Sequence, residues 1–218
     1  MNKEQRAVVV ISSLAPAGRK RLKVLYRALE TISVEISDHM LRPVYGSYTV
    51  LAGARAGRAQ FATAILAAAA RDEIQAIDAV VVLHGSPGKI IFDDGDGKGV
   101  SVPATDVAAD LAPAAPKLRM LYSTACYAAS DSAALLGAGF DASCGAVGEC
   151  ANGPVEFPQV LSMWSHSHTL KDAVAKGDDP STRVIFDTVA KWSGFSHANS
   201  QKQIDGDASI TIDTAALP

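Results

Sequence analysis

A histidine and a cysteine stand at the ends of two apolar segments of the chain. His84 and Gly85 close the segment DAVVVLHG (78–85), and Cys126 follows LRMLYS (118–123) after two residues. A histidine can take the proton of a thiol, and the thiolate can then attack a carbonyl carbon to form an acyl intermediate. Two buried strands that end on this pair of residues therefore predict acyl-transfer chemistry.

Acyl transfer also needs hydrogen-bond donors for the oxyanion of the tetrahedral intermediate. The backbone N–H groups of Gly85 and Cys126 are the candidates. Gly85 has no side chain that would block the approach of a substrate carbonyl.

The elements that must position these residues follow from hydrophobic patterning. Short apolar or β-branched runs predict strands, and apolar residues at helical spacing predict helices. The predicted strands are 7–13, 44–51, 78–85, 118–123, 140–148 and 209–213, with a small hairpin formed by 89–92 and 100–102. The predicted helices are 18–32, 56–74, 105–111 and 130–139, followed by amphipathic stretches at 155–176 and 181–193.

Strands that alternate with helices predict an α/β fold with three layers and a mainly parallel central sheet. Functional groups of such sheets gather beyond the carboxyl ends of the strands, where His84 and Cys126 are both expected. The sequence has no internal repeat and no low-complexity linker, so we expect a single domain over residues 1–218.

Composition excludes several classes of protein. Hydrophobic residues make up 48% of the 218 residues, which is typical of a globular protein with a sizeable core. The 20 Lys and Arg against 23 Asp and Glu give a net charge of −3 without a basic stripe, so nucleic acid is not an expected partner. The longest apolar run, at 62–70, is about half the length that spans a bilayer. We therefore expect no membrane association.

The cysteines and the amino terminus bear on localisation. Cys126, Cys144 and Cys150 are an odd number without a Cys-x-x-Cys motif, which suggests neither a disulfide framework nor a zinc site. The apolar run that begins at Ala7 is about six residues long, shorter than a secretory signal needs. We expect a cytoplasmic protein without metal or cofactor, and patterning leaves its oligomeric state open.

The order of these segments resembles the caspase-like (clan CD) cysteine peptidases, which include the caspases and the clostripain-like enzymes. The matching segments are VVVLHGSPG (80–88) and LRMLYSTACYA (118–128), in which the cysteine comes 42 positions after the histidine. The resemblance covers roughly residues 7–176. It implies that His84 is the general acid or base, Cys126 the nucleophile and Gly85 an oxyanion donor, with a peptide or protein as substrate.

The chain departs from these families where they recognise substrates. Caspases have Gln-Ala-Cys-x-Gly and an arginine after the first strand, whereas this chain has Thr124-Ala-Cys and a Ser12-Ser13 pair. Clostripain-like enzymes have Asp-Ala-Cys, so Thr124 also replaces their acidic recognition residue. Glu149, just after the predicted strand 140–148, is a candidate for lining the S1 pocket and attracting Lys or Arg.

Alternative interpretations remain. The chain could be a catalytically inactive relative that acts as an interaction module, since it shows no clear substrate determinant. LHGSPG also resembles an oxyanion segment of α/β-hydrolases, but the Gly-x-Ser-x-Gly motif of those enzymes is missing. The acidic turn at 93–99 imitates part of a calcium loop, although Thr105 stands where a glutamate should bind the ion.

Overall fold

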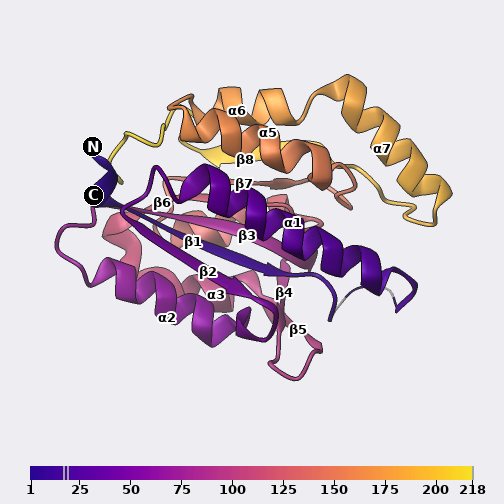
Figure 1. Cartoon of the computed structure of the whole chain (residues 1–218), viewed down its shortest axis with the longest axis horizontal. Helices are drawn as coiled ribbons and strands as arrows, with labels where there is room; N and C mark the ends of the chain where they lie inside the picture. Colours follow the sequence, from indigo (N-terminus) through magenta and orange to yellow (C-terminus); the bar gives the residue numbers. More distant parts are fainter. Residues whose placement is uncertain (17, 19, 218) are drawn as a thin grey trace.

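A single mixed sheet forms the centre of the computed structural model, which describes residues 1–16, 18 and 20–217 (Figure 1). Its main path runs in the order β2-β1-β3-β6-β7-β8, and a hairpin of β4 and β5 branches from β3. The strands are β1 (Arg6–Ser13), β2 (Ser47–Ala52), β3 (Ala76–Ser86), β4 (Lys89–Asp93), β5 (Gly99–Pro103), β6 (Leu118–Ser123), β7 (Ala142–Ala146) and β8 (Lys202–Gly206). Neighbours from β2 to β7 pair in parallel, while β8 and the hairpin are antiparallel.

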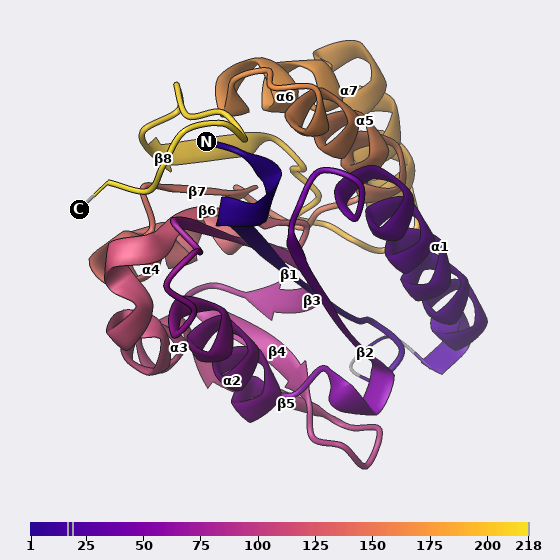
Figure 2. The ribbon, with the colours of Figure 1, turned by 60° about the vertical axis from the view of Figure 1, so that its left-hand side comes forward.

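Helices cover both faces of the sheet (Figure 2). One face carries α1 (Lys23–Leu41), α5 (Gly153–Ser165), α6 (Leu170–Gly177) and α7 (Pro180–Trp192), and the other carries α2 (Arg58–Ala69), α3 (Ala104–Leu111) and α4 (Ser132–Gly137). Short 3₁₀ segments lie at Lys3–Gln5, Lys20–Leu22, Gly53–Arg55, Ala112–Lys117 and Ala128–Asp131. The predicted α/β class and three-layer architecture are confirmed.

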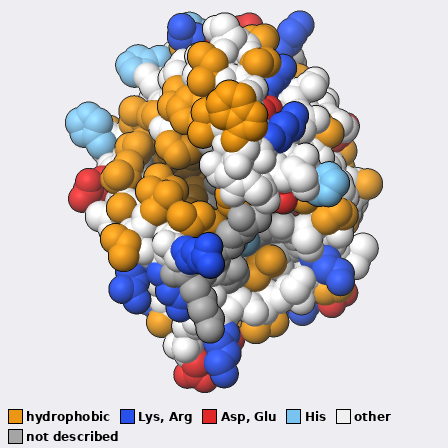
Figure 3. Space-filling view, turned by 90° about the vertical axis from the view of Figure 1, so that its right-hand side faces the viewer, with side chains coloured by type: hydrophobic (Ala, Val, Ile, Leu, Met, Phe, Trp, Pro, Cys, Tyr) orange, Lys and Arg blue, Asp and Glu red, His pale blue; other side chains and the backbone are white. Residues whose placement is uncertain are grey.

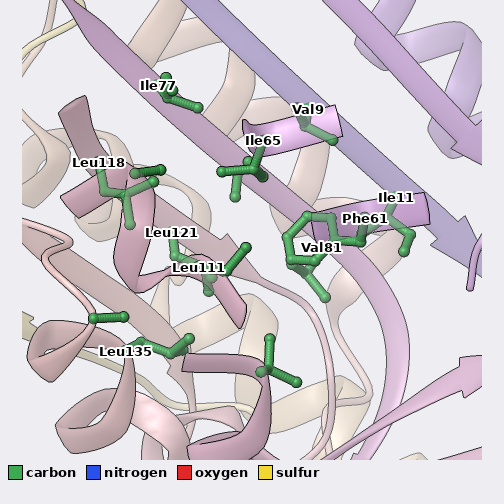
Figure 4. Close-up of a cluster of buried hydrophobic side chains, with 14 of the residues drawn as sticks. Val9, Ile11, Phe61, Ile65, Ile77, Val81, Leu111, Leu118, Leu121 and Leu135 are labelled. Atoms are coloured by element: carbon green, nitrogen blue, oxygen red, sulfur yellow. The ribbon is translucent and has the colours of Figure 1, made fainter. Parts of the chain in front are cut away.

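The strands alternate between two hydrophobic cores, as the period of two in a β-strand requires. Val9 and Ile11 of β1 point to the core shared with Phe61 and Ile65 of α2, part of which is shown in Figure 4. Val8 and Val10 belong instead to the core under the other helix layer, which contains Phe157, Leu161 and Trp164 of α5. Because both faces of β1 are buried, its sequence is apolar without alternation.

The prediction of a final strand at residues 209–213 is wrong, since the antiparallel edge strand is β8. Ile210 and Ile212 are buried, which explains the strand-like alternation. Their neighbourhood forms no ladder because the Arg119 guanidinium donates to the carbonyl oxygens of Thr211, Ile212 and Thr214. Arg119 is itself buried and paired with Asp78, so hydrogen bonds from this fixed side chain, rather than strand pairing, hold the C-terminal segment.

Helix boundaries differ from the prediction at several places. The first helix begins later and ends at Leu41 instead of residue 32, because Ser37 and Leu41 still face the sheet. Residue 19, inside the predicted helix 18–32, lies outside the described residues. The predicted stretch 155–176 is divided into α5 and α6. Within the described part of the chain, no helix is both long and apolar enough to cross a bilayer.

Candidate active site

The parallel pairing of β3 and β6 brings the ends of these strands to the same edge of the sheet. Val81 pairs with Ser123, and the N–H of the next residue, Thr124, donates to the Val81 carbonyl at 2.9 Å. His84 and Cys126 each lie three positions beyond this last pair. The two candidate catalytic residues therefore extend from neighbouring strands at corresponding heights.

Close backbone packing joins the His84 and Cys126 segments. A Cβ atom placed on Gly85 would lie 2.5 Å from the Cys126 carbonyl oxygen and 3.2 Å from the Ala125 Cβ. Real side chains do not tolerate such a contact with backbone, so only glycine allows the two segments to approach this closely. The predicted importance of Gly85 thus has a packing reason besides the oxyanion role inferred from the resemblance.

The imidazole of His84 is half-buried and has a defined orientation. Its Nε2 lies 2.8 Å from the carbonyl oxygen of Leu14, the residue that follows β1. A carbonyl can only accept a hydrogen bond, so Nε2 carries the proton and Nδ1 of the neutral ring can act as a base. The ring of Tyr26, on α1, meets the imidazole edge to face at 5.0 Å between centroids. Burial lowers the pKa of His84, although the bond to Leu14 opposes this effect.

The thiol of Cys126 lies in a turn of constrained geometry. The following residue, Tyr127, has a φ of 59°, in the left-handed region that side chains rarely adopt, and its N–H donates to the Gly148 carbonyl at 2.8 Å. The backbone N–H of Cys150 points at the Cys126 sulfur, at 3.4 Å. Burial raises the pKa of the Cys126 thiol, and this backbone hydrogen bond partly offsets the effect. Both shifts favour the neutral forms, a thiol at Cys126 and an imidazole at His84.

Behind the Cys126 turn lies a buried ionic cluster that the sequence analysis did not identify. Lys202 of β8 pairs with Glu156 of α5 at 3.3 Å and donates to the Ser123 carbonyl at 2.8 Å. Tyr122 donates to the same Glu156 carboxylate at 2.6 Å. Burial by itself lowers the pKa of Lys202, but the nearby Cys150 thiol and Glu156 carboxylate raise it overall, so the lysine is charged. No local motif marks these residues, because they meet only through the tertiary fold.

The two candidate substrate-binding residues occupy different surroundings. Thr124 continues the β6–β3 pairing, and its hydroxyl lies 3.5 Å from the Val81 carbonyl. Glu149 lies in the loop between β7 and α5, where its carboxylate accepts from the His197 N–H at 3.0 Å. Its negative charge contributes to the raised pKa of Cys126, so it acts on the thiol from nearby. One oxygen of Glu149 is thus engaged in fixing its own loop.

The acidic turn at 93–99 and the buried Cys144 both have local structural explanations. Asp94 in the turn between β4 and β5 accepts from the N–H groups of Asp96 and Lys98, which is a local turn stabilisation. Among the residues that the structure describes, no three His, Cys, Asp or Glu side chains gather as a metal site would require. Burial raises the pKa of Cys144, which is inside β7, to about 12. Cys144 is therefore a fully buried, protonated thiol that belongs to the hydrophobic core.

An exposed apolar surface flanks this edge of the sheet. It is formed by α1 and α7, and Figure 3 shows apolar side chains gathered around a hollow on this face. The large exposed side chains on the two helices are Val24, Leu25, Ile32, Val184, Ile185, Val189 and Trp192, of which Val24 and Trp192 are more than four-fifths exposed. Large apolar side chains that are exposed together on one face are typical of interaction sites. We call these seven residues the α1–α7 surface.

Comparison with known proteins identifies the fold. No protein-family model matches the sequence, and no curated protein matches it. Among solved structures, caspase-1 from Spodoptera frugiperda is similar with a TM-score of 0.63 and 13% identity, over 94% of this chain and 87% of that one.

A second similar structure is a secreted C11 cysteine protease from Bacteroides thetaiotaomicron, solved with an irreversible peptide inhibitor. The TM-score is 0.53 at 12% identity, and the match covers 85% of this chain. The chain spans only 58% of the length of that protease. Together with the strand order and the helix layers, these similarities show that the chain has the caspase-like, clan CD fold of cysteine proteases.

Proposed function

We propose that the protein is a cysteine endopeptidase in which Cys126 is the nucleophile and His84 the general acid and base. The observation that carries this proposal is the placement of the two residues on adjacent strand ends whose backbones touch at Gly85. The caspase-like fold supports it, since both structural neighbours are cysteine proteases. The expected substrates are peptides or proteins.

The neutral resting pair determines the order of the chemical steps. As the Cys126 sulfur attacks the substrate carbonyl, its proton passes to Nδ1 of His84, and the backbone N–H groups of Gly85 and Cys126 stabilise the oxyanion. The imidazolium then protonates the leaving amine as the peptide bond breaks, which leaves a thioester. Water attacks the thioester as it gives a proton to His84, and the imidazolium returns that proton to the departing Cys126 sulfur, so that the acid product leaves and the free thiol is regenerated.

The Leu14 carbonyl has a defined part in this cycle. It holds the Nε2 proton of His84 at 2.8 Å, which keeps Nδ1 available as the base. When the ring becomes charged, the same carbonyl accepts a stronger hydrogen bond from it. A backbone oxygen thus fills the orienting role that a carboxylate fills in other triads.

We further propose that Glu149 favours substrates with Lys or Arg before the cleaved bond. Its charge acts on Cys126, and Thr124 lies at the base of the same turn without a charge of its own. Fluorogenic peptides that differ only in this residue test the proposal. Because loss of the Glu149 charge also changes the pKa of Cys126 for every substrate, the specific effect is the ratio of kcat/KM for Lys and Arg substrates to that for Leu substrates. Glu149→Gln should lower this ratio, and an unchanged ratio would contradict a role in specificity.

Covalent labelling tests the catalytic assignment. A peptide acyloxymethylketone should modify Cys126 in preference to Cys144 and Cys150, as read by mass spectrometry of proteolytic fragments, and His84→Ala should slow the modification sharply. Equal labelling of the three cysteines, or an unchanged rate in His84→Ala, would contradict the assignment.

A second candidate is a non-enzymatic interaction module, which the α1–α7 surface favours because its apolar side chains are unusually exposed. This function predicts that Cys126→Ala folds and binds partners as the native chain does, whereas Trp192→Ser weakens binding. A peptidase should instead keep intact substrate bound in Cys126→Ala and fail to cleave it.

A further inference from the structure

The carboxylate of Glu30 on α1 contacts the backbone segment on which the orientation of His84 depends. Its Oε1 accepts hydrogen bonds from the backbone N–H groups of Leu14 and Ala15, the latter at 2.8 Å. Glu30 thereby joins α1 to the turn that follows β1. Hydrogen bonds of backbone N–H groups to an ionised carboxylate are about twice as strong as those between neutral groups.

One peptide group connects Glu30 with His84. The N–H of Ala15 and the C=O of Leu14 belong to the same planar amide, whose two ends point in opposite directions. The N–H end donates to Glu30, and the C=O end accepts from Nε2 of His84 at 2.8 Å. Consecutive hydrogen bonds of this kind polarise one another, so a carboxylate on one end makes the carbonyl at the other end a better acceptor.

We propose that Glu30 is a positioning residue that orients His84 and stabilises its positively charged form through the Leu14–Ala15 peptide group. The arrangement corresponds to a histidine–carboxylate pair with an amide inserted between its members. Its catalytic consequence rests on the proposed function, since only a peptidase cycle requires His84 to become charged. The coupling of Glu30 to His84 does not depend on that function.

Other charged and titratable groups surround Glu30 and His84, and their effects on the pKa of His84 must be distinguished from that of Glu30. Lys23 and Arg27 line a depression of about 200 Å³ together with Glu30, and as cations they oppose its effect on His84. The Tyr26 ring packs on the imidazole from α1. Across the β3–β6 edge, the titratable residue of the facing segment is Cys126, whose backbone lies against Gly85. The charge of Glu30 raises the pKa of His84, but burial outweighs it and lowers the pKa overall.

Titration of His84 by NMR tests the proposal without requiring enzymatic activity. Glu30→Gln keeps an oxygen that can accept from the two N–H groups but removes the charge, and it should lower the pKa of His84 by roughly 0.5 to 1. Glu35→Gln is the matched control, because it makes the same change at an exposed position of the same helix. The Glu35→Gln change should leave the pKa of His84 unchanged.

The native chain provides a second measurement, which remains valid if Glu30→Gln does not fold. The amide proton of Ala15 should shift with the same midpoint as the His84 ring, because charging the imidazole polarises the peptide group between them. An Ala15 amide proton whose chemical shift does not follow the titration of His84 would overturn the proposal. An equal shift of His84 in Glu30→Gln and Glu35→Gln would do so too, since it would indicate a general field effect.

Kinetics separate this inference from the proposed function. If the protein is a peptidase, the acidic limb of its kcat/KM profile should move to lower pH in Glu30→Gln by the same amount as the NMR midpoint. An NMR shift in a chain that cleaves no peptide would contradict only the endopeptidase. Cleavage with an unmoved acidic limb and an unmoved NMR midpoint would contradict only the role of Glu30.

Discussion

Gly85 lies against the backbone of Cys126, at a distance that leaves no room for a side chain. A Cβ at position 85 would come within 2.5 Å of the Cys126 carbonyl oxygen. Because the obstacle is backbone rather than a flexible side chain, either β3 or the Cys126 turn must move to accommodate any larger residue. The thiol and the imidazole would then lose their relative placement.

Gly85→Ala should therefore reduce kcat/KM by at least about 100-fold, because small displacements of catalytic groups have effects of this size. Gly137→Ala is the control, since a Cβ there meets nothing within 4 Å and the residue ends α4. It should keep full activity. Peptide hydrolysis and chemical denaturation of both variants check this, and an active Gly85→Ala would show that the close approach is not required.

The pH dependence of thiol reactivity follows from the two shifted titrations. Burial raises the pKa of Cys126 and lowers that of His84, so both shifts favour the neutral pair over a thiolate–imidazolium pair. The rate of alkylation by iodoacetamide should therefore climb steadily through neutral pH, because the thiolate is the reactive species. A plateau that begins near pH 5 would indicate a preformed ion pair and contradict this account.

Removal of Lys202 should destabilise the protein strongly. Lys202→Met would leave the buried carboxylate of Glu156 without its cation, at a cost of about 3–5 kcal/mol in the free energy of unfolding. The double variant with Glu156→Gln should recover much of this loss, because no uncompensated charge then remains. Urea denaturation of the single and double variants gives the coupling energy. Equal stability of Lys202→Met and the native chain would mean that the pair is not charged.

Asp131, in the 3₁₀ segment after Cys126, should make stability depend on pH. It is buried, its Oδ1 has no hydrogen-bond partner, and burial raises its pKa to about 7. The folded state thus retains a proton that the unfolded state releases near its ordinary value of 3.8. This contribution to stability is present at low pH and is lost as the pH rises from about 4 to 7, with a slope on the order of 1.4 kcal/mol per pH unit.

Asp131→Asn should remove this dependence of the free energy of unfolding on pH. Its stabilisation relative to the native chain should be larger near pH 8 than near pH 5 by about 2.5 kcal/mol, as measured by urea denaturation. Asp72→Asn, at an exposed position, should show no such difference. A stabilisation by Asp131→Asn that is independent of pH would contradict a raised pKa for this carboxyl.

Sequence patterns predicted the strands that are apolar because both of their faces are buried. The run from Ala7 to Ser13 and the segment that ends on His84 are buried on both faces, so their apolar residues identified them as strands. Strand β8 was missed because its sequence KQIDG is polar, as suits an edge strand. Ile210 and Ile212 are both buried and alternate with polar residues, and this pattern predicted a strand. The pattern does not reveal that Arg119 binds the backbone carbonyls of this segment.

The candidate site could be predicted only in part, for a similar reason. His84, Gly85 and Cys126 were recognisable by residue type and by their positions at strand ends. The Leu14 carbonyl is a backbone group, so no residue type signals it. Glu30 and Lys202 are ordinary charged residues whose roles depend on contacts with segments distant in the sequence. Such partners become visible only when the fold brings them together.

Trapping of an acyl intermediate tests the central claim most directly. Rapid acid quenching of a reaction with a mixed peptide ester library, followed by proteolysis and mass spectrometry, would locate any acyl group on the chain. We predict a thioester on Cys126 that forms within the first turnover, is missing in Cys126→Ala and forms far more slowly in His84→Ala. Peptide cleavage without an adduct on Cys126, or an adduct on Cys150 instead, would contradict the account.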